Sequence, residues 1–295
     1  MFDLRYHVVS LTAVFLALAI GILVGVGISG RGFVDRAERT RLNGDIAQLR
    51  SQLDETSGRA DALGAAQAAA QQYIRDTYPV LAEGRLTGKR IALLYVGSID
   101  AAVDRSVRDA VATAGGRVVR VRALLMPFPT EAIEAELAAS PTLAGYAGER
   151  HLGDLGRDLA RELVGAGPTP LWDALGDKLL EERAGTPRGE LDGVVLVRPA
   201  PPQQAGSARF LDGLYAGLAG SGVAVVGVEA VVPTKSALPV FRAHRLSTVD
   251  GIDTPAGRLA LALLLGGAEE GSYGTQETDR SILPPIEPVP VGPGG

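Results

Sequence analysis

Few side chains in this sequence have the types and spacing that chemistry requires. The 295 residues include no cysteine, three histidines and two methionines. Thiol catalysis, disulfides and thiolate metal sites are therefore excluded. The histidines are His7, His151 and His244, and neither they nor Met1 and Met126 stand at ligand spacing. Soft metal ions such as Cu(I), which prefer thiolate and thioether ligands, find few donors in this chain.

Two segments place polar residues where α/β proteins often bind ligands. Gly97-Ser98-Ile99-Asp100 follows an apolar run, but it lacks both the G-x-G-x-x-G spacing of a dinucleotide site and the lysine of a P-loop. We interpret it as a turn and a helix cap. Asp250 and Asp253 could bind a divalent cation, yet these residues are also typical of a turn before a helix, and we favour the turn.

No arrangement typical of an enzyme is found in the sequence. His151 and His244 have no obvious acidic or nucleophilic partner nearby, and neither a G-x-S-x-G elbow nor the order of a Ser-His-Asp triad is present. We therefore expect no catalytic residues, no cofactor, no metal site and no enzymatic activity. The net charge of −5 and the scattered Lys and Arg residues argue against nucleic acid as a partner.

The strongest structural signal is an apolar run near the N-terminus. Val8 to Ile28 carries no charged residue, and as a helix it would extend roughly 31 Å, against ~30 Å for the hydrocarbon core of a bilayer. A cleaved signal peptide is the alternative, but its apolar region would be about half as long, and no Ala-x-Ala site follows the run. Residues 1–30 are thus predicted to form a retained transmembrane anchor in contact with membrane lipid.

The orientation of this anchor is ambiguous in the sequence. Arg5 precedes the run, whereas Arg31, Arg36, Arg39 and Arg41 follow it. Under the positive-inside rule, this distribution places the rest of the chain in the cytoplasm.

Small residues recur every four positions within the apolar run. Ala13, Ala17, Gly21 and Gly25 would share one stripe of a helix, where two backbones can approach closely. Gly and Ala are frequent in membrane helices in any case. Because four small residues stand in register and a heptad pattern follows them, we expect this stripe to be a dimer face.

Residues 31–79 are predicted to form a coiled-coil stalk. Apolar residues at alternating steps of four and three mark a heptad register, and we expect a helix from Phe33 to Tyr78 that ends before Pro79. The alternative is an amphipathic helix folded back on the rest of the protein. We favour a parallel homodimer, whose seam would include Leu42, Ile46, Leu49, Leu53, Leu63 and Ile74.

Residues 80–271 alternate between apolar runs and helical patterns. The pattern predicts a parallel sheet in a three-layer α/β domain, either Rossmann-like or flavodoxin-like. Its expected strands are Lys89–Val96, Arg117–Leu125, Leu191–Val197 and Gly222–Val228, and its expected helices are Ala101–Ala114, Gln203–Ala219 and Thr254–Leu265. A helical insertion is expected near residues 131–183, and residues 272–295 are expected to form a Pro-rich extended tail.

Several segments together resemble one known family. They are LRYHVVSLTAVFLALAIGILVG at the N-terminus, the heptads behind it, STVDGIDTPAGRLALALLLGG, and GSYG followed by LPP. In this order they resemble the actinobacterial MctB family, labelled copper transport outer membrane proteins, which includes the SteB-type cell-separation factors. The resemblance spans nearly the whole chain.

The resemblance implies two different functions. The family label implies copper efflux or an envelope channel. The SteB-type members imply a periplasmic dimer that helps to control a peptidoglycan hydrolase together with a second membrane protein. Both imply that the part of the chain after the anchor, here called the body, lies outside the cytoplasm. We adopt that orientation, although the distribution of arginines around the anchor favours the opposite one. We expect a single-pass envelope protein acting as a non-enzymatic dimeric coiled-coil scaffold or regulator, with a copper efflux or channel component as the alternative.

Overall fold

The computed structural model describes residues 4–28, 31–186, 188–198, 205–231, 235–275 and 281–288. The chain divides into two units, Met1–Ala70 and Gln71–Gly295. Gly30 at the end of the predicted anchor and the last residues of the predicted tail lie outside the described ranges.

The first unit is helical throughout its described residues. Helix α1 spans Leu4–Ile28 and contains the predicted transmembrane run. Within it, His7–Gly27 has a mean hydropathy of 2.6, which meets the length and composition that a bilayer span requires. Among the described residues, no other helix meets both conditions.

Helix α2 spans Arg31–Ala82, so the prediction that it ends before Pro79 was wrong. Pro79 has no N–H to donate, but its carbonyl accepts a hydrogen bond from the Glu83 N–H at 2.9 Å. Tyr78 and Ala82 are both buried in the second unit. The burial of this last turn stabilises it more than the proline weakens it, because tertiary packing overrides local preference.

The described residues of the second unit form a seven-stranded sheet of order β3-β2-β1-β4-β5-β6-β7. The four predicted strands are confirmed as β1 (Arg90–Val96), β2 (Arg117–Leu124), β4 (Gly193–Val197) and β5 (Ala224–Val228). Apart from the antiparallel β2–β3 pair, all neighbouring strands are parallel. When β3 is set aside, β2-β1-β4-β5-β6 is the flavodoxin-like order and not the Rossmann order.

Three short strands were not predicted. They are β3 (Leu180–Gly185), β6 (Ser247–Val249) and β7 (Ser272–Tyr273). β7 pairs with β6 and Tyr273 is buried, so the predicted tail from residue 272 begins inside the sheet. β3 is polar and exposed at the edge, where no apolar alternation is needed. Short edge strands such as β3 are stabilised mainly by hydrogen bonds to a neighbouring strand, so their sequences show little alternation of apolar and polar residues.

The predicted insertion near residues 131–183 is mainly helical, as expected. It contains α4 (Thr130–Ala139), the 3₁₀ turns Ala144–Tyr146 and Glu149–His151, α5 (Leu152–Val164) and α6 (Pro170–Leu179). The insertion ends in β3, which adds an antiparallel edge to the sheet. Its helices pack in the main core, so they belong to the domain and are not an appendage.

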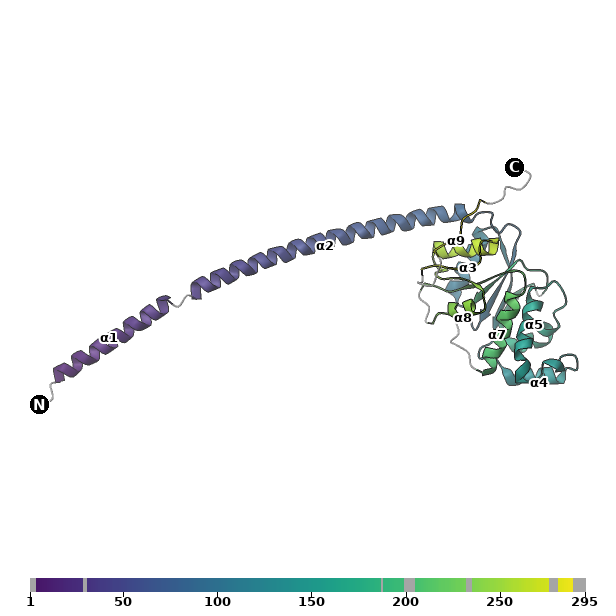
Figure 1. Cartoon of the computed structure of the whole chain (residues 1–295), viewed down its shortest axis with the longest axis horizontal. Coiled ribbons are helices and arrows are strands. Elements are labelled where there is room, and N and C mark those ends of the chain that lie inside the picture. Colours follow the sequence, from purple (N-terminus) through teal and green to yellow (C-terminus); the bar gives the residue numbers. More distant parts are fainter. Residues whose placement is uncertain are drawn as a thin grey trace. The chain divides into compact units, whose positions relative to one another are not determined.

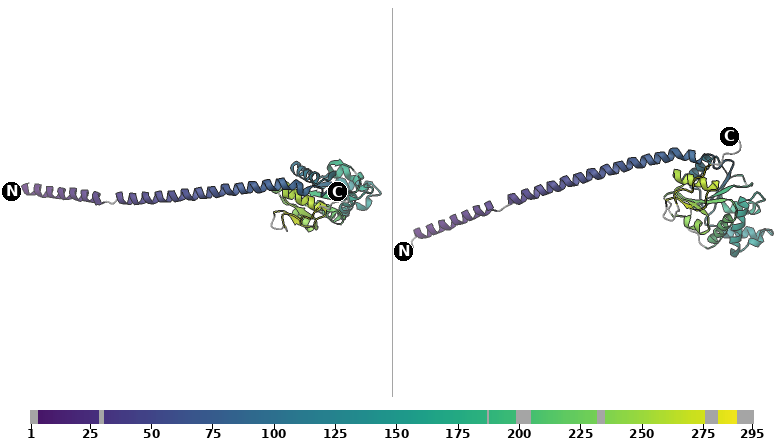
Figure 2. Two further views of the ribbon diagram at one scale, coloured as in Figure 1. Left: turned by 90° about the horizontal axis from the view of Figure 1, so that it is seen from above. Right: turned by 45° about the horizontal axis from the view of Figure 1, so that its top comes forward.

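Helices cover both faces of the sheet, which confirms the three-layer arrangement. One face carries the end of α2, α3 (Ala101–Thr113) and α9 (Pro255–Gly266). The other carries α4 to α6, α7 (Ala205–Ala219) and α8 (Leu238–Ala243). α3 lies beside α9, and α5 beside α7 (Figure 1). In both views of Figure 2 the yellow α9 stays apart from the teal α4–α6 region of the body.

Helices α5 and α7 pack unusually closely because glycines line their contact. A Cβ atom on Gly213 would lie 1.9 Å from the Gly153 carbonyl oxygen, and one on Gly217 would lie 2.6 Å from the Arg157 carbonyl oxygen. On the facing helix, a Cβ on Gly156 would lie 2.2 Å from the Phe210 carbonyl oxygen. The two backbones are therefore in direct contact, and no larger residue fits between them.

We predict that Gly213→Ala lowers the free energy of unfolding by about 3 kcal/mol, because the methyl group forces α5 and α7 apart. Denaturant unfolding followed by the fluorescence of Trp172, the only tryptophan, measures this. Gly145→Ala is the matched control, since nothing lies within 4 Å of its Cβ position. Its effect should stay within about 0.5 kcal/mol. Equal stability of the two variants would contradict the close contact.

Candidate functional site

The carboxyl edge of the sheet is the usual ligand-binding place in such folds, at the point where the strand order reverses. Here that point lies between β1 and β4, next to Gly97 to Asp100. The Asp100 carboxylate accepts the N–H groups of Ala102 at 2.8 Å and Val103 at 3.1 Å. The interpretation of this segment as a helix cap is confirmed, and the carboxylate is engaged with its own helix.

The acidic residues after β6 are likewise engaged with the backbone. Asp250 is buried and accepts both the N–H of Thr275 at 2.9 Å and its hydroxyl at 3.1 Å. Asp253 accepts the N–H of Val231 at 2.9 Å, and the hydroxyl of Thr254 accepts the N–H of Gly257. These contacts support the turn-and-cap interpretation, and they show that Asp250 attaches the segment after β7 to the sheet.

Sequence reasoning missed a second buried carboxylate at this edge, besides Asp250. Glu229 follows β5 directly and is 7% exposed. It accepts hydrogen bonds from the Ser236 hydroxyl at 2.9 Å and from the Ala237 N–H at 2.9 Å. A charged residue immediately after an apolar strand was the available signal. These donors immediately precede α8, so the contact holds the loop between β5 and α8 in place.

Both described histidines of the body have acidic neighbours that the sequence did not reveal. His244 Nε2 lies 3.3 Å from Asp212 Oδ1, and His151 Nδ1 lies 3.7 Å from Asp154 Oδ2. The sequence showed no obvious partner for either histidine, and in the structure both side chains are half-buried next to a carboxylate. Asp212 lies on α7 and is distant in sequence, so only the packing of α7 against α8 brings it close. Within the described ranges, no three His, Asp or Glu side chains gather as metal ligands would.

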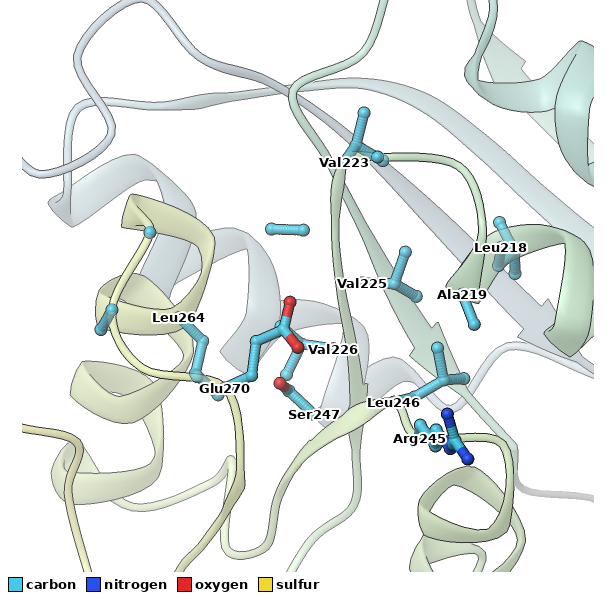
Figure 3. Close-up of a pocket in the computed structure, with 14 residues that line it drawn as sticks. Leu218, Ala219, Val223, Val225, Val226, Arg245, Leu246, Ser247, Leu264 and Glu270 are labelled. Carbon is cyan, nitrogen blue, oxygen red and sulfur yellow. The ribbon is translucent and has the colours of Figure 1, made fainter.

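A pocket of about 400 Å³ opens at the opposite edge of the sheet, near the amino ends of β5 and β6 (Figure 3). Glu270 and Ser247 stand on one side of it and Arg245 on the other, and Leu218 of α7 and Val225 of β5 also line it. Arg245 has a φ of 60°, a conformation that residues other than glycine rarely adopt. The charged residues that line this pocket, Arg245 and Glu270, are both exposed to solvent.

A row of large apolar residues at heptad spacing on α2 is exposed in the single chain. The row comprises Leu42, Ile46, Leu49, Leu53, Leu63 and Ile74, with exposed fractions between 42% for Ile74 and 70% for Leu63. The small residues of α1, Ala13, Ala17, Gly21 and Gly25, are also exposed, and nothing lies within 4 Å of a Cβ position on Gly21 or Gly25. The predicted helices are formed, and a single chain leaves both rows uncovered.

Comparison with known proteins links the whole chain to one group. A family model described as "Copper transport outer membrane protein, MctB" matches residues 1–284. Proteins named "Copper transporter MctB" from Mycobacterium bovis and Mycobacterium tuberculosis are each 28% identical to the chain over 319 aligned residues. The alignments cover 96% of this chain and 99% of those proteins. The similarity therefore includes α1 and α2 as well as the α/β body.

Proposed function

Because the chain belongs to the MctB family of copper transport outer membrane proteins, we propose that it is a single-pass envelope protein. In this proposal α1 anchors the chain in the membrane, and two copies join through α1 and α2. The α/β body acts outside the cytoplasmic membrane as a non-enzymatic scaffold or regulator. Its partners would be a second membrane protein and a peptidoglycan hydrolase, as the resemblance to SteB-type members implies.

The observation that carries the proposal is the exposed apolar row on α2. Large apolar side chains at heptad spacing are typical of a helix that packs against another helix. Burying one Leu or Ile fully contributes about 1.5–3 kcal/mol. Two copies together bury the rows of both helices, which can offset an association cost of ~4–15 kcal/mol. Anchoring in one membrane lowers that cost, because it raises the effective concentration of the partner.

The small-residue stripe on α1 favours the same partner. Ala13, Ala17, Gly21 and Gly25 lie one turn apart along one side of the helix. In lipid, where apolar side chains gain nothing by leaving solvent, close backbone approach is what favours association. A dimer joined through α2 brings two α1 helices together, so the two surfaces support one assembly.

The body supports a scaffold more than an enzyme. The carboxylates of Asp100, Glu229 and Asp250 at the carboxyl edge accept hydrogen bonds from backbone N–H groups of nearby turns and helices. A general base or nucleophile must instead face a substrate. The names of the relatives raise the alternative of a copper efflux component. Copper would then be the transported substrate. Because the described residues include one helix that could span a membrane, a pore would need several copies of the chain or another protein.

We predict that cysteine at Leu49 or Leu53 forms disulfide-linked dimers in membranes, each through the same position in two copies, because both lie on the proposed seam. Mild oxidation followed by non-reducing electrophoresis measures this. Ser51→Cys, exposed on another side of α2, is the control and should crosslink several-fold less. Monomers at every position, or equal crosslinking at all three, would contradict the seam.

We predict that a cysteine at Ala138, which is exposed on α4, reacts with a membrane-impermeant maleimide in intact cells whose wall has been made permeable. The sequence contains no other cysteine, so the label reports this position alone. Cells lysed before labelling give the maximum signal. Reaction only after lysis would place the body in the cytoplasm, as the arginine count alone suggests.

We predict that the full-length protein in detergent binds Cu(I) no more tightly than a generic protein surface, because soft donors are scarce and scattered. Competition with a chromophoric Cu(I) chelator measures the affinity. Met126→Leu and His244→Gln should give the same curve as the unchanged protein. Stoichiometric sub-micromolar binding that either substitution abolishes would instead support a direct role in copper transport.

A further inference from the structure

Strand β2 carries two buried arginines on one face. Arg120 and Arg122 stand two residues apart and are 1% and 7% exposed. Burying a charge away from water costs several kcal/mol unless hydrogen bonds or an opposite charge compensate it. The two guanidinium groups meet this requirement to different degrees.

Arg120 is fully engaged with the backbone. Its Nε donates to the Thr186 carbonyl at 3.0 Å, its Nη2 donates to the Gly189 carbonyl at 3.0 Å, and its Nη1 donates to the Leu163 carbonyl. Leu163 lies in the last turn of α5, where free carbonyls and the helix dipole favour a cation. Burial, reinforced by Arg122, lowers the pKa of Arg120 to about 10, so it remains charged at neutral pH.

Only one nitrogen of the Arg122 guanidinium group donates hydrogen bonds to the described residues of the protein. Its Nη1 donates to the Val121 carbonyl at 2.7 Å and to the Ala184 carbonyl at 3.2 Å. In the part of the chain that the structure describes, Nε and Nη2 meet no acceptor. Burial lowers the pKa of Arg122 and nearby Arg183 lowers it further, with no carboxylate acting in the opposite direction. A buried cation thus lies beside a second cation.

Arg122 lines a pocket of about 480 Å³ at the β2–β3 edge, together with Thr169, Trp172, Asp173 and Arg183. Asp173, which lines the pocket, and Asp177, which pairs with Arg183, each have an arginine partner. Asp173 pairs with Arg188 at 2.6 Å and also accepts the Thr169 hydroxyl, while Asp177 pairs with Arg183 at 3.1 Å. One positive charge, that of Arg122, is left without a counter-ion among these groups.

We propose that this pocket binds an oxyanion, a phosphate or carboxylate group, through Nε and Nη2 of Arg122, with Arg183 at its rim. The planar fork of an arginine matches two oxygens of such a group and forms two parallel hydrogen bonds with it. The ligand supplies the counter-charge that Arg122 lacks. The pocket lies on the α/β body, so this binding is independent of whether two copies join through α1 and α2.

Trp172 makes the proposal directly testable, because the only tryptophan of the chain lines the pocket. Inorganic phosphate and, separately, acetate are titrated into the full-length protein in detergent at constant pH and ionic strength, with chloride as the balancing anion. Tryptophan emission should change saturably with at least one of the two. The anion that acts shows whether a phosphate or a carboxylate is preferred.

Matched variants connect the signal to the site. Arg122→Gln should weaken binding roughly tenfold or more, since it removes both charge-assisted donors, and the exposed Arg183→Gln should weaken it less. Arg105→Gln, an exposed arginine on α3, should leave the curve unchanged. Circular dichroism verifies that each variant is folded, and Arg183→Gln carries the test if Arg122→Gln is not. No saturable change with either anion, or curves unaffected by both pocket substitutions, would overturn the proposal.

Discussion

The architecture of the body depends on burying the central strands on both faces. Along β1, Ala92, Leu94 and Val96 enter one hydrophobic core, and Ile91, Leu93 and Tyr95 enter the other. A strand that is apolar on both sides must be covered twice, which requires helices on each face and therefore crossover connections. The parallel sheet, the two helix layers and the position of the carboxyl edge all follow from this burial.

The same burial requires hydrogen bonds for the charged groups that lie inside the body. Glu229, Asp250 and Arg120 are buried, and each forms hydrogen bonds with backbone groups where a helix or loop begins or ends beside the buried strands. An unpaired polar group there would cost about as much as a good packing contact contributes. Arg122 differs from these groups, because within the described ranges only its Nη1 donates to backbone carbonyls, those of Val121 and Ala184.

The two units differ in how much apolar surface they leave exposed. The body buries its apolar side chains between the sheet and the helices, and glycines bring α5 and α7 into backbone contact. The first unit exposes apolar side chains along α1 and α2. A bilayer covers a uniformly apolar helix, whereas a row at heptad spacing on a polar helix suits a second helix. The family to which the chain belongs is described as copper transport outer membrane proteins.

Local patterns along the chain were enough to predict several features of the structure. The apolar run of α1, the long helix α2, the four central strands and the caps at Asp100 and Thr254 were all predictable, because hydrophobic period and capping residues act over a few positions. The tertiary structure alone decided the flavodoxin-like strand order, the edge strands β3 and β7, and the continuation of α2 through Pro79. It also decided that Asp212 meets His244 and that Arg122 lies buried beside Arg183. Each of these depends on contacts between residues far apart in the chain, and a local pattern carries no information about which distant segment will supply the partner.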